Sequence, residues 1–180
     1  MKTKPIIIFL LLSLTQCTDK SPAKSNHPAE GSSVPRQKTS SANKNILNNI
    51  VAEEKGGLKI AAAYLADAGG KIINPQNTVA PGSPVFLIIQ IQDGWRVNKG
   101  YVSPGALQTI TTQNGEPVLQ SPDLFAGAKS IRAADAANLQ LKTVIINTRP
   151  DIAYYIVRFR IWDKGGTGAI NGYYHLWVEN

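Results

Sequence analysis

The sequence predicts an all-β fold, a two-sheet antiparallel sandwich of about seven or eight strands. Segments that alternate apolar and polar residues recur between residues 57 and 180, and clusters of glycine and proline separate them. The chain holds 15 glycines and 11 prolines against 12 acidic residues, a balance that favours turns over long amphipathic helices. A helical bundle is therefore excluded as the leading expectation.

The first half of this domain predicts a strand, a turn that leads into the start of a return at 71–73, and a further strand. Residues 58–64 alternate, which places every second residue up to Tyr64 on one inward face. Asp67-Ala68-Gly69-Gly70 supplies a turn. Residues 85–92 begin with a run that is apolar on both faces, so we expect a central strand there.

The middle of the domain is less regular. A strand is expected over 106–112, where Leu107 and Ile110 can both be core residues only if the register shifts. Asn114-Gly115 is a strong hairpin signal. Residues 121–137 lack alternation and predict a long crossover with one helical turn, and a phase slip near Thr143 predicts a β-bulge.

Two long adjacent strands, 155–162 and 170–178, are predicted to end the chain. Their alternation separates an inward set from an outward set. The inward set is Val157, Phe159, Ile161, Tyr174, Leu176 and Val178. The outward set is Arg158, Arg160, Tyr173, His175 and Trp177.

The motif W-D-x-G-G-x-G over residues 162–168, followed by G-Y-Y-x-L-x-V over 172–178, resembles the last hairpin of immunoglobulin-like sandwich modules in bacterial envelope proteins. This resemblance is confined to the end of the chain. It implies an immunoglobulin-like sandwich and says nothing of a specific activity.

The amino terminus has the pattern of a bacterial signal peptide. Lys2 and Lys4 precede an apolar run over residues 6–14, and this run is far shorter than the roughly 20 residues that a membrane-spanning helix needs. The run ends in Leu14-Thr15-Gln16-Cys17, which contains the only cysteine of the chain. A single cysteine excludes an intramolecular disulfide and any multi-cysteine metal site.

Leu14-Thr15-Gln16-Cys17 resembles the lipobox of bacterial lipoproteins. The resemblance implies that a diacylglycerol is joined to Cys17, that residues 1–16 are removed as the signal peptide, and that lipid holds the protein in the membrane. Because Thr18 rather than Asp follows the cysteine, the resemblance points to the outer membrane. The alternative is an ordinary secretory signal in which Cys17 is incidental.

After Cys17, the amino-acid composition changes twice, once at the start of a polar segment and once near residue 46. Residues 17–45 are rich in Ser, Pro, Lys and Asn and are predicted to form a disordered tether. Ile46, Leu47, Ile50 and Val51 recur at helical spacing, so a short helix or linker is expected over 46–56. The sandwich domain is expected over 57–180.

The charge argues against a nucleic-acid partner. The formal net charge of the chain is +7, but residues 57–180 carry only 11 basic against 8 acidic residues, a net charge of +3. Of the remaining eight basic residues, two lie in the predicted signal peptide, five in the predicted tether and one, Lys55, in the segment 46–56. They form no compact basic footprint of the kind that binds nucleic acid.

No catalytic motif is present in the sequence. The histidines are His27 in the tether and His175 in a predicted strand, and no G-x-S-x-G motif accompanies them, so we predict neither an enzyme nor a bound cofactor. Aspartates occur singly in predicted turns without the spacing of a calcium loop. These single aspartates are Asp93, Asp123, Asp135, Asp151 and Asp163.

Trp95, Arg96 and Tyr101 follow the end of a predicted strand, and we take them as candidate partner-binding residues because Trp and Arg are enriched where proteins grip partners. The alternative is that Trp95 plugs the end of the sandwich. The leading hypothesis is a lipid-anchored envelope protein that binds an envelope protein or polymer. Two alternatives are an accessory lipoprotein of a trans-envelope complex and a carbohydrate-binding or calcium-dependent module.

Overall fold

The computed structural model describes residues 44–179, and these residues form the all-β, two-sheet sandwich that the sequence predicts. The predicted signal peptide, Cys17 and nearly all of the predicted tether lie outside the described residues. Eight strands have four or more residues, and four further strands have two residues each. Within residues 44–179, no helix is long and apolar enough to cross a bilayer.

One sheet has four strands in the order β1-β3-β5-β10. All of its pairs are antiparallel except the short parallel pair β1–β3. The central position of β5 confirms the strand predicted over 85–92, because β5 pairs with β3 on one side and β10 on the other. The strands are β1 (Asn45–Ile46), β3 (Lys59–Ala66), β5 (Pro84–Asp93) and β10 (Asn138–Val144).

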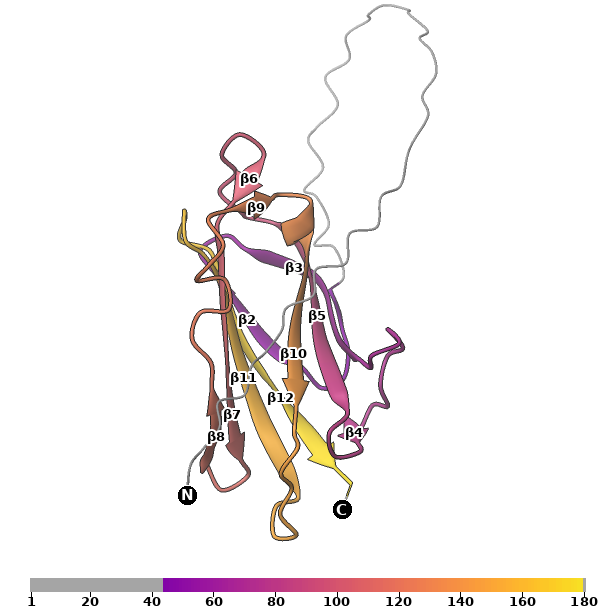
Figure 1. Ribbon diagram of the computed structural model, residues 1–180. Helices are drawn as coiled ribbons and strands as arrows, with labels where there is room; N and C mark the ends of the chain where they lie inside the picture. The colour runs from indigo at the N-terminus through magenta and orange to yellow at the C-terminus, as the bar shows by residue number, and fades with distance from the viewer. Residues whose placement is uncertain (1–43, 180) are drawn as a thin grey trace, which may run out of the picture. The chain divides into compact units, whose positions relative to one another are not determined.

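The second sheet has six strands, of which five follow the order β2-β12-β11-β7-β8, and the sixth, β4, pairs with β12 in parallel. A separate ribbon of β6 and β9 lies at one end of the sandwich, and the carboxyl terminus lies towards the opposite end (Figure 1). The second sheet consists of β2 (Val51–Lys55), β4 (Thr78–Val79), β7 (Pro104–Thr112), β8 (Pro117–Gln120), β11 (Tyr154–Asp163) and β12 (Ala169–Val178). The ribbon consists of β6 (Tyr101–Val102) and β9 (Ile131–Arg132).

The inward faces of the two sheets form one apolar core. The predicted inward residues of the last two strands are all buried, as are alternate residues of β5. Figure 1 shows the long strands of the two sheets in two layers. Burial of this apolar surface is the main stabilising contribution to a fold of this kind.

One polar cluster interrupts the core and joins the two sheets. The hydroxyl groups of Tyr174 on β12 and Thr143 on β10 share a hydrogen bond of 3.0 Å, and the Gln108 amide on β7 donates to Thr143 Oγ1 at 3.2 Å. All three side chains are buried, and burial raises the pKa of the Tyr174 phenol far above its ordinary value. Since an unpaired buried polar group costs roughly 1–3 kcal/mol, the cluster disfavours any other alignment of the sheets.

Glycine allows the last two strands to pack closely. Gly172 on β12 lies opposite Phe159 on β11, and a Cβ atom at position 172 would collide with the Phe159 ring. Gly105 on β7 is covered in the same way by Trp162. The G-Y-Y and W-D elements of the terminal motif therefore have a packing role.

The helix or linker expected over 46–56 is wrong, because this segment forms β1 and β2 on two different sheets. Asn48 and Asn49 have φ values of 55° and 51°, a left-handed conformation that Asn tolerates and that interrupts a helix. The Asn48 side chain fixes this turn, because its Oδ1 accepts the Leu65 N–H at 2.9 Å. The described sandwich consequently includes residues before position 57.

The inward position expected for Tyr64 is also wrong. The pairing of β3 with β5 shifts register between Lys59 and Ala62. The shift moves the inward face to Ala63 and Leu65, both fully buried, and leaves Tyr64 outward.

Of two further expectations in the middle of the chain, that for Leu107 and Ile110 holds and that for Thr143 is wrong. Leu107 points outward, because Ala106, Gln108 and Ile110 form the inward face of β7. The bulge predicted near Thr143 is absent from β10, which pairs with β5 in one continuous register. The phase slip in the sequence arises because Thr143 is a buried polar residue on the inward face.

The hairpin and the crossover agree with the sequence. Gly115 has a φ of 85° in the turn between β7 and β8. Residues 121–137 connect β8 in one sheet to β10 in the other, and they include a single 3-10 turn at Asp135–Ala137.

Candidate functional site

Four aromatic rings lie together on the outward face of the six-stranded sheet. Tyr154 on β11 lies between His175 and Trp177 on β12, with ring centroids 5.0 and 5.2 Å away. Tyr173 continues the row at 5.8 Å from His175, and His175 meets Trp177 edge-on at 5.7 Å. These separations are those of interacting aromatic pairs.

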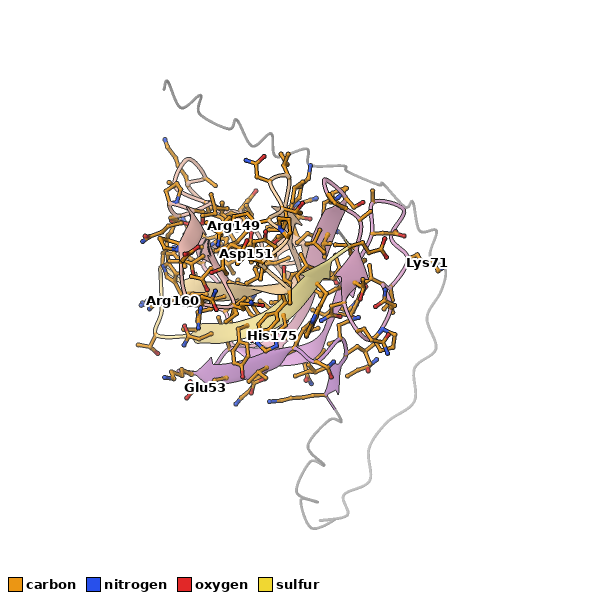
Figure 2. The ribbon with its side chains drawn as sticks, turned by 90° about the horizontal axis from the view of Figure 1, so that it is seen from below. Glu53, Lys71, Arg149, Asp151, Arg160 and His175 are labelled. Atoms are coloured by element: carbon orange, nitrogen blue, oxygen red, sulfur yellow. The ribbon has the colours of Figure 1, made fainter. Side chains whose placement is uncertain are left out.

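Two arginines extend this face along β11. Arg158 donates to Thr111 Oγ1 at 3.3 Å, and the Arg160 guanidinium lies 5.4 Å from the ring centre of Trp162. Neither arginine forms an ion pair with any described residue. Figure 2 shows His175 and Arg160 on this sheet, with Glu53 on the neighbouring strand β2.

We call this surface the aromatic face and define it by Tyr154, Tyr173, His175, Trp177, Arg158 and Arg160. At its Trp177 end it continues into a shallow pocket of about 490 Å³. The amides of Asn49 and Gln76 line this pocket with Trp177. The surface thus combines ring faces, cations and amide groups.

A second pocket, of about 600 Å³, lies at one end of the sandwich between the loop after β5 and the crossover segment. We call it the basic pocket. Three of its lining residues are cations, and none is acidic. Its polar lining residues include Arg96, Asn98, Lys99, Tyr101, Lys129 and Ser130.

Asp163, the last residue of β11, holds two walls of the basic pocket together. Its carboxylate is buried and accepts the Arg96 N–H at 2.6 Å and the Gly165 N–H at 2.8 Å. The Arg96 guanidinium in turn donates to the Gly165 carbonyl oxygen at 2.9 Å. One carboxylate therefore ties the loop after β5 to the β11–β12 turn.

The third wall is the crossover segment, and a hydrogen bond and an ion pair connect it to the rest of this end of the sandwich. Ser103 Oγ donates to the Lys129 carbonyl oxygen at 3.3 Å, and Lys164 Nζ lies 2.6 Å from Asp123 Oδ2. Burial on its own would raise the pKa of Asp123, but Lys164 and the N–H groups of Phe125 and Ala106 outweigh it, so the pKa is lowered. Lys164 and Asp123 thus neutralise each other outside the pocket lining.

The structure brings two of the three candidate partner-binding residues together. Arg96 and Tyr101 both line the basic pocket. Trp95 does not line it; its side chain packs against the core, and its indole Nε1 is buried with no hydrogen-bond partner among the described residues. A role in binding for Trp95, Arg96 and Tyr101 stays a prediction.

The sequence predicted only part of the aromatic face. Alternation placed Tyr173, His175 and Trp177 outward, which the structure confirms. It did not show that Tyr154 completes the row, because that depends on the pairing of Tyr154 with Trp177 across two strands. Cross-strand register is the signal that was missing.

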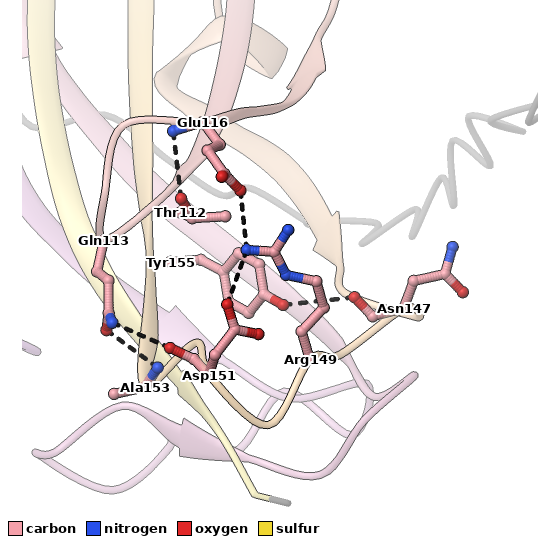
Figure 3. Close-up of polar contacts among 8 residues, drawn as sticks. All are labelled: Thr112, Gln113, Glu116, Asn147, Arg149, Asp151, Ala153 and Tyr155. Carbon is pink, nitrogen blue, oxygen red and sulfur yellow. Dashed lines mark hydrogen bonds and ion pairs between the residues drawn. The ribbon is translucent and has the colours of Figure 1, made fainter.

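At the opposite end of the sandwich, one arginine pairs with two carboxylates. Arg149 bridges Glu116 at 2.8 Å and Asp151 at 3.1 Å, as Figure 3 shows. The Gln113 amide donates to the Asp151 carbonyl oxygen at 3.2 Å. These contacts close the loops and leave no unpaired arginine in the cluster that Figure 3 draws.

The carboxylates of two other aspartates that were predicted in turns, Asp93 and Asp135, contact residues close to them in the chain. Asp93 accepts the Gly94 N–H, and Asp135 pairs with Arg132 at 2.9 Å. Within residues 44–179, no three His, Cys, Asp or Glu side chains are grouped so that they could hold a metal ion.

Comparison with known proteins finds no matching family model and no matching curated protein. Among solved structures, the sandwich is similar to one described as "Crystal structure of the C-terminal domain of wzt". The sequence identity is 14%, the alignment covers 77% of this chain and 83% of that chain, and the TM-score is 0.45. Similarity at this level says nothing about ligand or function.

We expect Asp163→Asn to lower the free energy of unfolding by about 1–3 kcal/mol, because an amide oxygen can replace only one of the two carboxylate acceptors. The partly buried N–H of Arg96 or of Gly165 then loses its partner. Urea unfolding followed by circular dichroism measures the change. Asp93→Asn is the matched control, because exposed Asp93 accepts only the neighbouring Gly94 N–H. Equal losses for the two variants would contradict this role of Asp163.

Proposed function

We propose that this protein is a lipid-anchored bacterial envelope protein whose sandwich is a non-enzymatic binding module, and that the aromatic face is its recognition surface. The observation that carries the proposal is the row of four rings beside two arginines without carboxylate partners among the described residues. The predicted lipid on Cys17 supplies the location, and the sheet face supplies the binding surface.

The chemistry of this face favours an extended partner that is partly apolar and carries negative charge. Tyr, Trp and His rings offer large contact areas with polar rims, so they bind ligands whose flat apolar surfaces also carry hydroxyl groups. Arg158 and Arg160 add fixed positive charge whose hydrogen-bond donors suit carboxylate or phosphate groups. An acidic envelope polysaccharide combines these properties.

His175 supports binding rather than catalysis. Its ring lies within a row of aromatic side chains, at 5.0 Å from Tyr154 and 5.7 Å from Trp177. A ring held in this way presents a contact surface. General-base catalysis instead requires a histidine placed within hydrogen-bond reach of a nucleophile.

The predicted anchor is tested on protein purified from bacterial membranes. Intact-mass measurement should find a chain that begins at Cys17 and carries diacylglycerol, and Cys17→Ser should lose both the lipid and membrane retention. The reason is that acyl chains contribute about 0.8 kcal/mol per buried methylene, so two or three chains retain the protein. A wild-type chain with an unmodified Cys17 thiol, recovered in the soluble fraction, would remove the anchor from the proposal.

The binding surface is tested by measuring the affinity of the full chain for the acidic polysaccharide of its own envelope, using isothermal titration calorimetry. Trp177→Ala and Arg158→Gln should each weaken binding about tenfold or more, because truncation of a central aromatic or arginine contact costs roughly 1–2 kcal/mol or more. Neither side chain belongs to the buried core. Circular dichroism melting should therefore show only small changes in Tm.

Tyr64→Ala is the matched control, because Tyr64 is an outward aromatic residue on the other sheet. Unchanged polysaccharide affinity in the Trp177→Ala variant, or an equal loss in Tyr64→Ala, would overturn the assignment of the face. The alternative is an accessory subunit of a trans-envelope complex. It would be favoured if crosslinking in native membranes gave one defined protein complex that Trp177→Ala abolished, with no polysaccharide binding by the wild type.

A further inference from the structure

We propose that the basic pocket binds the phosphate group of anionic membrane lipids and docks this end of the sandwich on the bilayer. This inference rests on the proposed lipid anchor and adds a second, specific contact with the membrane. Its evidence is the composition of the pocket, its rigid support and the position of the chain entry.

The pocket concentrates positive charge that the described residues do not neutralise. Arg96, Lys99 and Lys129 line it, and none of them pairs with a carboxylate of residues 44–179. The nearby carboxylate of Asp163 is buried and accepts two backbone N–H groups. Other lysines and arginines at this end, such as Lys164 and Arg132, have acidic partners of their own.

Local backbone structure fixes the position of Lys99 in the lining of the pocket. Lys99 and Gly100 form the tip of a tight turn, with φ values of 50° and 83°, and mutual backbone hydrogen bonds between Asn98 and Tyr101 close it. Consecutive positive φ values are typical of a type I′ turn. The Ala133 N–H donates to the Gly100 carbonyl oxygen at 2.9 Å, which ties this tip to the crossover segment.

Neutral donors complete the site. Ser130 and Tyr101 contribute hydroxyl groups, and Asn98 contributes an amide. Arginine and lysine with such donors match the charge and the acceptor oxygens of a phosphate group. The pocket, of about 600 Å³, has room for a phosphate group that belongs to a larger headgroup.

The described chain begins beside β3, where Asn45 pairs with Ala62, on the half of that strand nearer the basic pocket. Lys44 pairs with Glu54 at 2.8 Å, near the turn of Gly56 and Gly57 that joins β2 to β3. A Cβ atom at Gly94 would collide with the backbone of Gly57, so this turn touches the beginning of the loop that lines the basic pocket. Lys44 therefore lies closer to the pocket end of the sandwich than to the opposite end.

The disordered tether predicted from the sequence would be long enough for this contact. If residues 18–43 form that tether, they span roughly 25–30 Å. Each cation close to an anionic bilayer contributes about fivefold to the binding constant, so three cations contribute on the order of a hundredfold. Docking at this end would leave the aromatic face, which runs along the strands, exposed beside the bilayer.

Hydrogen exchange of the full lipidated protein tests the proposal, with the protein reconstituted in vesicles of phosphatidylglycerol or of phosphatidylcholine. On phosphatidylglycerol, exchange at residues 98–103 and 129–130 should slow at least several-fold, and Lys99→Gln/Lys129→Gln should abolish the effect. Lys71→Gln/Lys142→Gln is the matched control, because it removes the same charge from exposed lysines outside the pocket. A third arm adds inorganic phosphate alone to the protein in detergent.

Equal protection on the two kinds of vesicle, or retained protection in Lys99→Gln/Lys129→Gln, would overturn the proposal. Equal protection by inorganic phosphate at millimolar concentration would replace the lipid by a free anion as the ligand. The intact mass of the same preparation reports separately whether Cys17 carries lipid. Should it carry none, co-sedimentation of the unlipidated chain with the same two kinds of vesicle decides the pocket proposal by the same criteria.

Discussion

The register of β11 against β12 is the constraint on which the rest of the structure depends. In this pairing Val157 lies opposite Tyr174 and Tyr155 opposite Leu176, all four buried, while Tyr154 lies opposite Trp177 on the outer side. Because side chains alternate, a slip of one residue would expose the core and bury the arginines. The same pairing thus builds the core and the aromatic face, and neither can change alone.

Two residues within β12 make this register specific. Gly172 leaves room for the Phe159 ring, which a side chain at that position would displace. Tyr174 reaches across the core to Thr143 on the other sheet. At the end of β11, the Asp163 carboxylate accepts the N–H groups of Arg96 and Gly165. These hydrogen bonds fix two loops of the basic pocket relative to the strand. The core, the face and the pocket are therefore parts of one rigid framework.

The sequence predicted the parts of this fold that follow from regular alternation, and it failed where a tertiary contact decides. The inward and outward residues of the last two strands were correct because no bulge interrupts them. Tyr64 was misplaced because a register shift in β3 depends on how it pairs with β5. Residues 46–51 have helical spacing, but the left-handed Asn48 and the edges of two sheets impose strands.

For the candidate sites too, the sequence indicated individual residues, but tertiary contacts decide which of them lie together. Trp95, Arg96 and Tyr101 stood out by residue type, but only the folded loops separate the packed Trp95 from the pocket that holds Arg96 and Tyr101. No feature of the sequence links Lys129 to the pocket, because it lies 33 positions after Arg96 in a crossover without alternation. Juxtapositions of this kind come from topology and cannot be deduced from local sequence.

The three tryptophans of the chain allow one direct measurement of the central claim, that the outward face of β11 and β12 binds the partner. In a proton–nitrogen spectrum of the labelled full chain in detergent, each indole N–H gives its own signal. On addition of the acidic polysaccharide, we expect the Trp177 signal to shift in a saturable manner while the signal of Trp95, whose indole Nε1 is buried, stays in place. A shift of Trp95 with no change at Trp177 would rule out binding at the aromatic face.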